Sequence, residues 1–247
     1  MIFVGITLGC LVFADMAITT VEPWPEFKRL ITGLITPNFF GTENLIESIA
    51  YTLSFALLGV AFANIFGLCF AILFSSNIVR MGCAIVRSVH ELFWALIFLQ
   101  IFGLSPLTGI LAIAIPYSGI IAKVYAEILE EADSRPLQAL PTATGRVSAF
   151  IFVRLPDVWV QFRTYSMYRL ECGIRSSAVL GFIGLPTIGF HLESAFKEGH
   201  YSEVSALLIL FYIVIASIRV WVKRGLLPLY LIAACLILPW GVSFSFS

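Results

Sequence analysis

The sequence predicts an all-α protein: a polytopic transmembrane helical bundle with six core spans and an additional C-terminal apolar span. Of its 247 residues, 60% are apolar and only 12% are charged, far from the composition of a soluble domain. The apolar residues form long blocks, and a helix needs about 20 of them to cross the hydrocarbon layer. Helices are expected because lipid offers the backbone no hydrogen-bond partner. A β-barrel would show alternating segments of about 10 residues instead.

Seven apolar blocks follow one another along the chain. The first, residues 1–20, is expected to be an uncleaved span or a shortened start, because it has neither a basic front nor a small-residue cleavage site. Residues 21–44 contain three prolines and several aromatic side chains, which suits an interfacial loop or a helix lying on the membrane surface. The other blocks are residues 45–74, 79–102, 107–128, 158–190, 204–222 and 226–242.

Polar segments between the blocks carry further expectations. Residues 127–154 form the longest polar stretch of the second half, and predict either a short protruding helix pair or an ordinary loop. The glycine-rich run Gly181–Gly189 should break its helix, as a hinge or pathway element or as a plain turn. Residues 191–203 are expected to form a polar loop.

Basic residues in the short loops predict the orientation. With a cytoplasmic N-terminus, the loops on that side contain Arg80, Arg135, Arg146, Arg154, Lys223 and Arg224. The opposite side contains only Lys28, Arg29 and Lys197. This bias follows the positive-inside rule, and it places the N-terminus in the cytoplasm.

Several functions find no support in the sequence. A net charge of zero gives no basic surface for nucleic acid. The five cysteines are scattered, and His90-Glu91 lacks the second histidine of HExxH, so neither a metal site nor a zinc protease is predicted. The GxSxG motif of serine hydrolases and the GxxxxGK[ST] motif of ATPases are both missing. Catalytic residues are therefore not expected, and residues 1–247 are interpreted as a single transmembrane domain.

Charged residues inside the third and fifth blocks are the most informative feature. Each costs at least about 2.5 kcal/mol at mid-membrane, so such groups usually face a bundle interior or a wet path. Arg87 and Glu91 are four residues apart and could pair on one helix face. Two cations, Arg169 and Arg175, share only Glu171, which leaves a local positive excess suited to an anion path. Structural pairing between helices is the alternative reading.

Three segments resemble the phosphonate-type permeases of bacterial ABC importers. They are Arg87–Phe98 (RSVHELFWALIF), Tyr168–Gly184 (YRLECGIRSSAVLGFIG) and Ile188–Phe190, and the likeness extends over residues 43–224. Residues 134–156 look like the coupling loop that docks such permeases on their ATPase. Within this loop the resemblance assigns the coupling role to Gln138, Ala139, Gly145, Leu155 and Pro156. The loop departs from the family pattern, because Gln138 replaces a glutamate and Gly145 comes one position late.

The resemblance implies the import of phosphonate, or of a related oxyanion such as phosphite, across the bacterial inner membrane. It implies a second permease subunit, identical or different, two ATP-binding subunits that hold ATP and Mg, and a periplasmic phosphonate-type binding protein. No cofactor is expected on this chain. The residues expected along the translocation path are Arg87, His90, Glu91, Arg169, Glu171, Arg175, Ser176 and Ser177.

Other readings stay open from the sequence. An importer of the same superfamily could carry an amino acid or a metal chelate instead. A membrane scaffold and an intramembrane enzyme are further alternatives. Family members commonly end after the sixth span, so the block 226–242 is an addition without an assigned role.

Overall fold

The computed structural model describes residues 4–6, 9–10, 23–39, 41–42, 44–133, 135, 145–222 and 226–240. The regular elements within these ranges are all helices, which confirms the all-α prediction. The predicted first span, residues 1–20, lies almost entirely outside the described residues.

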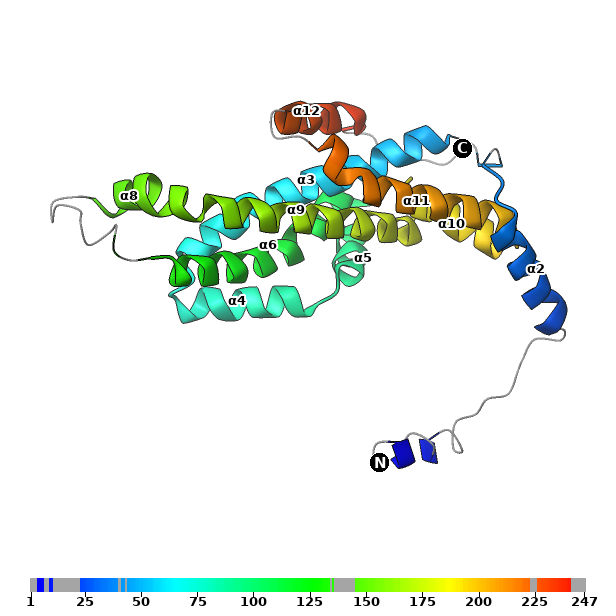
Figure 1. The fold of residues 1–247 in the computed structure, drawn as a ribbon, viewed down its shortest axis with the longest axis horizontal. Helices are drawn as coiled ribbons and strands as arrows, with labels where there is room; N and C mark the ends of the chain where they lie inside the picture. Colours follow the sequence, from blue (N-terminus) through cyan, green and yellow to red (C-terminus); the bar gives the residue numbers. More distant parts are fainter. Residues whose placement is uncertain are drawn as a thin grey trace.

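A bundle of long helices forms the body of the molecule. Four of them run along its long axis (Figure 1): α3 (Leu45–Ile72), α6 (Pro106–Glu131), α9 (Leu155–Val179) and α11 (Tyr201–Trp221). Within the described part of the chain, three helices are long and apolar enough to cross a membrane. The number rises to five if each of two bent helix pairs counts as one span. These five correspond to the predicted blocks from 45–74 to 204–222.

The contact between α3 and α6 is the centre of the core. Gly59 of α3 lies against Ile113 of α6, and about two helical turns further along Gly67 lies against Ile121. Both isoleucines are fully buried. Small residues on one helix allow the backbones to approach closely, which is how helices associate in lipid through van der Waals packing.

The third predicted block is not one straight helix. α4 (Asn77–Ser88) and α5 (Glu91–Phe102) meet at an angle of 91° across two extended residues, Val89 and His90. The predicted pair on one helix face, Arg87 with Glu91, is therefore wrong, because the two residues belong to different helices. No ion pair joins them in the described part of the structure.

The glycine-rich run breaks its helix as predicted. α9 continues into a short 3₁₀ helix, η2 (Leu180–Ile183), and the chain then turns at Gly184 with φ of 93°. The next helix, α10 (Ile188–Lys197), leaves at an angle of 51°. Gly189 lies directly against the Ala178 carbonyl, where any side chain would collide, so this glycine permits the tight packing of α10 on the end of α9.

The prediction of a polar loop over residues 191–203 is wrong. Most of this stretch belongs to α10 and to the first turn of α11, and only residues 198–200 between them are non-helical. Its charges stabilise a helix rather than a loop, since Glu193 and Lys197 form an ion pair of 2.6 Å one turn apart.

Two shorter helices flank the bundle. α2 (Pro23–Ile35) shows that much of residues 21–44 is helical, one of the two forms predicted, and it packs on α11. Its place at the membrane surface stays a prediction. α12 (Leu227–Ile237) packs on α3, and the Tyr230 hydroxyl donates to the Trp221 carbonyl at 2.6 Å. With 11 residues α12 is about 16 Å long, roughly half the hydrocarbon thickness, so a complete C-terminal span stays a prediction.

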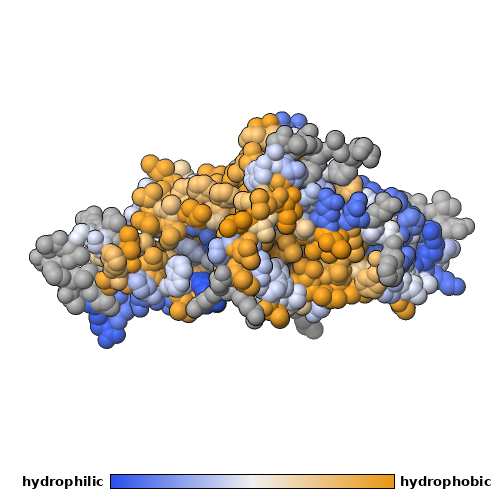
Figure 2. All heavy atoms as spheres, turned by 90° about the horizontal axis from the view of Figure 1, so that it is seen from above, coloured by the Kyte–Doolittle hydropathy of each residue, from blue (hydrophilic) through white to orange (hydrophobic). Residues whose placement is uncertain are grey.

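The surface follows the pattern of a membrane protein. In the view of Figure 2, apolar residues cover most of the middle of the molecule, and hydrophilic residues gather mainly towards its two ends. α8 (Arg146–Ala149) lies at one of these ends and α2 at the other (Figure 1).

Candidate functional site

The break between α4 and α5 positions the first two candidate residues. His90 is the N-cap of α5, and its Nδ1 accepts a hydrogen bond from the Leu92 amide at 3.2 Å. A neutral imidazole that accepts at Nδ1 carries its proton on Nε2. This Nε2 lies 3.7 Å from Oε1 of Glu91, whose side chain is only 19% exposed. The break thus turns the Glu91 carboxylate inward, towards α6 and α9.

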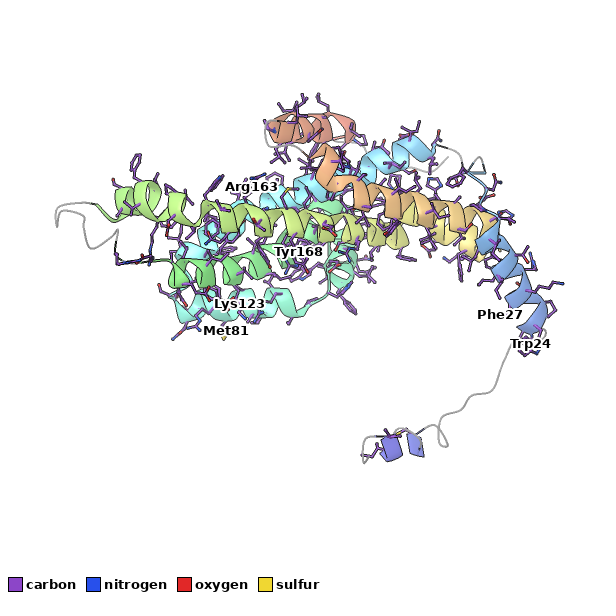
Figure 3. All side chains as sticks on the ribbon, viewed as in Figure 1. Trp24, Phe27, Met81, Lys123, Arg163 and Tyr168 are labelled. Carbon is purple, nitrogen blue, oxygen red and sulfur yellow. The ribbon has the colours of Figure 1, made fainter. Side chains whose placement is uncertain are left out.

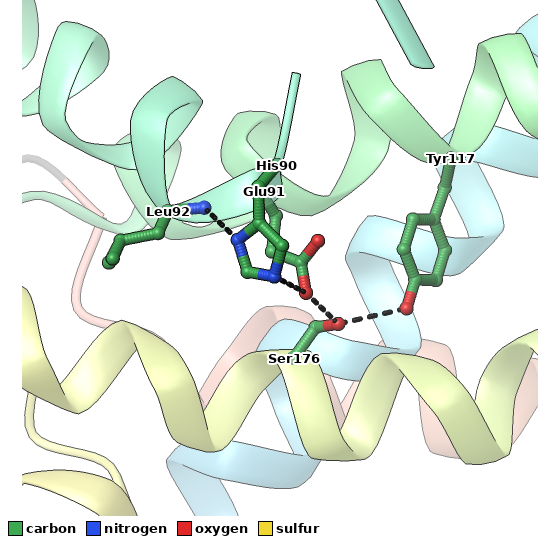
Figure 4. Close-up of polar contacts among 5 residues, drawn as sticks. All are labelled: His90, Glu91, Leu92, Tyr117 and Ser176. Atoms are coloured by element: carbon green, nitrogen blue, oxygen red, sulfur yellow. Dashed lines mark hydrogen bonds and ion pairs between the residues drawn. The ribbon is translucent and has the colours of Figure 1, made fainter. Parts of the chain in front are cut away.

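A chain of hydrogen bonds starts at this carboxylate (Figure 4). The Ser176 hydroxyl of α9 donates to Glu91 Oε1 at 2.7 Å. The hydroxyls of Ser176 and Tyr117 are 2.9 Å apart, so the Tyr117 hydroxyl must act as the donor in that bond. Ser176 and Tyr117 are both 5% exposed, and α5, α6 and α9 are therefore joined by one buried polar chain.

Arg169 lies beside the same tyrosine. Its guanidinium carbon is 5.5 Å from the centre of the Tyr117 ring, 5.2 Å from Tyr165 and 5.6 Å from Tyr168. Its Nε also donates to the Tyr165 hydroxyl at 2.8 Å. Aromatic faces attract a cation through their quadrupole. Figure 3 shows Tyr168 on the side of α9 that faces the viewer.

The predicted positive excess has a structural basis. Arg175 pairs with Glu171 of its own helix at 3.7 Å. In the described part of the chain no carboxylate lies within 4.0 Å of the Arg169 guanidinium, whose charge is held by tyrosines instead. We call Glu91, Tyr117, Arg169 and Ser176, together with Tyr165, the Tyr117 cluster. It gathers side chains from three helices into one partly exposed polar site.

Five predicted path residues lie outside this cluster. His90 borders it through Glu91, Arg175 pairs with Glu171, and the other two make no polar contact with it. Ser177 is fully buried, and its hydroxyl donates to the Ile174 carbonyl of its own helix, so it faces the core. Arg87 ends α4 as an exposed side chain and packs beside Gly119 of α6. Neither residue contributes a polar contact to the Tyr117 cluster.

The residues predicted to line the path did not include the tyrosines of the cluster, because tyrosines are common within apolar blocks. Tyr165, Tyr168 and Arg169 follow the i, i+3, i+4 spacing of one helix face, and this signal could have found them. Tyr117 has no such signal, because its partner Ser176 is 59 residues away.

A second polar layer crosses the bundle at Tyr125. The Tyr125 hydroxyl donates to the Asn64 side-chain oxygen at 2.6 Å, and Ser166 Oγ lies 2.7 Å from that hydroxyl and 2.9 Å from the Asn64 oxygen. The Tyr125 ring stacks on Phe162 at 4.0 Å. This layer joins α3, α6 and α9, and nothing in the sequence pattern indicated it.

The predicted coupling loop is described only in part. Gln138 and Ala139 lie outside the described residues, and Gly145 is exposed. Leu155 and Pro156 open α9, which follows α8 through a π-helical turn, η1 (Phe150–Arg154). In this turn the Leu155 amide bonds to the Phe150 carbonyl. Pro156 has no amide to donate, and it directly follows this turn, where the hydrogen-bond ladder changes from π-helical to α-helical.

An ion pair marks the start of the same loop. Arg135 contacts Asp133 Oδ2 at 2.6 Å through Nη2 and 2.7 Å through Nε, and its amide donates to Oδ1 at 2.9 Å. These hydrogen bonds from the Arg135 side chain and backbone lower the pKa of Asp133 below its usual value.

The fold has close counterparts among solved structures. One chain of an amino acid ABC transporter superposes with a TM-score of 0.61 at 17% identity, covering 86% of this chain and 99% of that one. A chain of the MetNI methionine ABC transporter in an inward-facing conformation gives 0.63 at 14% identity, covering 85% and 99%. These likenesses establish an ABC permease fold.

Sequence comparison decides the family. The phosphite transport system permease protein PtxC of Stutzerimonas stutzeri is 30% identical over 203 residues, which are 78% of this chain and 74% of that protein. This chain belongs to the phosphite- and phosphonate-type ABC transport permeases. Another relative of this permease is the phosphate-import permease protein PhnE of Mycolicibacterium smegmatis, 28% identical over 77% of this chain and 38% of that protein.

A third relative is the putative phosphite transport system permease protein HtxE of Stutzerimonas stutzeri, 30% identical over 57% of this chain and 54% of that protein. No protein-family model matches the sequence. As a member of this family the permease is a multi-pass membrane protein, of the inner membrane in bacteria, and a transport subunit rather than an enzyme.

Proposed function

We propose that this permease forms the path by which phosphite, or a phosphonate, enters the cell. ATP with Mg would be bound and hydrolysed on two separate ATP-binding subunits. A second permease subunit would complete the path, and a periplasmic binding protein would deliver the cargo. The N-terminus would lie in the cytoplasm. The relatives named for phosphite transport support the cargo, and the resemblance of residues 134–156 to a coupling loop supports the docking of an ATPase.

One structural observation carries the cargo assignment. Arg169 places a cation in the spanning part of the bundle with tyrosines around it, and no carboxylate of the described residues is at ion-pair distance. The guanidinium is planar and its hydrogen-bond donors match the spacing of oxyanion oxygens. Nε is already engaged with Tyr165, so the terminal nitrogens would contact the passing anion. A carboxylate partner would have cancelled this charge.

The assembly is tested by purifying the tagged permease in mild detergent and identifying its companions by mass spectrometry. We expect an ATP-hydrolysing subunit, together with either one permease sequence or two. A well-folded preparation that never contains an ATPase would contradict the proposal.

The cargo is tested by ATP-driven uptake of phosphite into proteoliposomes that contain the complex and its binding protein. Arg169→Gln should lower uptake about tenfold, because a hydrogen bond to a charged group is worth about 1.5–3 kcal/mol. The matched control is Lys123→Gln, which removes a half-exposed cation that pairs with Glu127 at 3.4 Å. Competition by an amino acid, with none by phosphonate, would assign the permease to a different cargo.

A further inference from the structure

A cavity of about 530 Å³ lies between α2 and the start of α11, at the end of the molecule opposite α8 (Figure 1). It is separate from the Tyr117 cluster. It is open to the outside. Lys28, Arg29 and Thr32 of α2 line it together with Thr36, which follows the helix, and residues 199–202 form the other wall. The volume is within the range of small-molecule sites and larger than a single inorganic anion requires.

The walls of this cavity are held in place by packing. Gly33 of α2 lies directly against Tyr201, where a side chain would collide. The Ser205 hydroxyl donates to the Gly33 carbonyl at 2.9 Å, and the Asn38 amide donates to the Ser202 carbonyl at 2.9 Å. α2 is thus fixed on α11, and the cavity is a preformed part of the fold.

Lys28 is the lining cation for which the described chain offers no carboxylate partner. Among the lining residues, Lys28 and Arg29 are cationic and no carboxylate is present. Arg29 is paired at 2.8 Å with Glu26, whose carboxylate also accepts from the Tyr201 hydroxyl at 3.4 Å, while no carboxylate of the described chain lies within 4.0 Å of the Lys28 ammonium group. The two other carboxylates nearby, Glu198 and Glu203, lie 3.4 and 3.9 Å from His200.

The opposite face of α2 is apolar and uncovered. Trp24 is 78% exposed and Ile35 is 73% exposed, and Phe27, Ile31 and Leu34 lie on the same side of the helix. Trp24 and Phe27 contact each other edge to face and point away from the bundle (Figure 3). Exposed aromatic residues of this kind are typical of the membrane–water interface. A cationic, hydroxyl-lined cavity therefore borders a stripe suited to acyl chains.

We infer that this cavity binds the phosphate group of an acidic phospholipid. The headgroup phosphate contacts Lys28 and Arg29, the rest of the headgroup fills the cavity, and the acyl chains lie along the apolar stripe of α2. Charge-assisted hydrogen bonds from lysine and arginine suit phosphate oxygens. A free phosphate ion shares this chemistry but leaves most of the cavity and the apolar stripe unused. The inference does not depend on the transported cargo.

The test uses the full-length permease with the subunits that co-purify with it. Wild type and Lys28→Gln/Arg29→Gln are placed in nanodiscs of phosphatidylcholine with or without phosphatidylglycerol. The readouts are the thermal unfolding midpoint and the lipid retained in native mass spectrometry. We expect phosphatidylglycerol to be retained by wild type and to raise its unfolding midpoint, and the double variant to lose about tenfold in apparent affinity.

Two further variants distinguish the loss of the lipid site from misfolding of the protein. Thr32→Leu fills the cavity without changing the charge and should also displace the lipid. Lys197→Gln is the control, because Lys197 is a 73% exposed cation on α10, outside the cavity. Equal lipid retention by wild type and by the folded Lys28 and Thr32 variants would overturn the inference. Stabilisation by inorganic phosphate in phosphatidylcholine nanodiscs, with none by phosphatidylglycerol, would assign the cavity to a soluble anion and overturn it as well.

Discussion

The Tyr117 ring lies 5.5 Å from the guanidinium carbon of Arg169, while its hydroxyl lies 2.9 Å from Ser176 Oγ. One side chain therefore touches both the unpaired cation and the hydrogen-bond chain that ends on Glu91. The two halves of Tyr117 can be separated by mutation, since the ring contacts Arg169 and only the hydroxyl contacts Ser176.

Tyr117→Phe should remove the hydrogen bond and keep the ring beside Arg169. We expect the free energy of unfolding to fall by about 0.5–1 kcal/mol, the usual worth of such a bond in a protein or a membrane bundle. Tyr117→Leu should cost more, because it also removes the aromatic contact with Arg169. Chemical or thermal unfolding in detergent measures both variants. Equal stability of the two would show that the ring contact contributes nothing.

The Glu91 carboxylate carries a charge and also accepts a hydrogen bond from Ser176, and two substitutions separate these contributions. Glu91→Gln keeps an oxygen that can accept from Ser176, so the fold should be close to wild type in stability. Glu91→Ala leaves the buried Ser176 hydroxyl without its acceptor and should cost about 1–3 kcal/mol. The comparison is made by unfolding both variants under one set of conditions. A larger loss for Gln than for Ala would contradict the contact.

Some of the fold could be predicted from one sequence, and the limits have physical causes. Helices α3, α6 and α11 follow from long apolar runs, because length and composition alone decide whether a helix suits lipid. The break at Val89–His90 was not predicted. The expected pairing of Arg87 with Glu91 assumed one unbroken helix across these residues. The helix α10 was taken for a loop because its charges were counted without asking whether they could pair one turn apart.

The candidate site was predicted only in outline. Arg169, Glu171 and Arg175 stand out because charges are rare inside apolar blocks, and the sequence alone indicates their positive excess. The contact of Glu91 with Ser176 joins residues 85 positions apart. Such a contact depends on how α5 and α9 pack, and no local pattern records it. The cavity under α2 was missed for the same reason.

The second polar layer, at Tyr125, should behave as a coupled unit. The hydroxyl oxygens of Tyr125 and Ser166 and the Asn64 side-chain oxygen lie 2.6–2.9 Å from one another. Both hydroxyls can therefore donate to the same Asn64 oxygen. A double-mutant cycle of Tyr125→Phe and Ser166→Ala should give an interaction energy of roughly 0.5–1.5 kcal/mol. Strict additivity of the two unfolding free energies would show that the hydroxyls act independently.

The tight packing at Gly189 gives the sharpest structural prediction. A methyl group there would strike the Ala178 carbonyl, and the collision involves backbone on both sides, so neither partner can rotate away. Gly189→Ala should therefore lower the free energy of unfolding by about 1–3 kcal/mol. It should also shift α10 away from the end of α9, which a spin-label distance between the two helices would detect.

The matched control is Gly82→Ala on α4, where nothing lies within 4 Å of the added methyl group. Alanine is the better helix former by about 1 kcal/mol, so this change should be neutral or stabilising. Both substitutions add the same single carbon to a helix, and only the surroundings differ. If Gly189→Ala matches Gly82→Ala in stability and leaves the spin-label distance unchanged, the two segments do not pack as tightly as this contact requires.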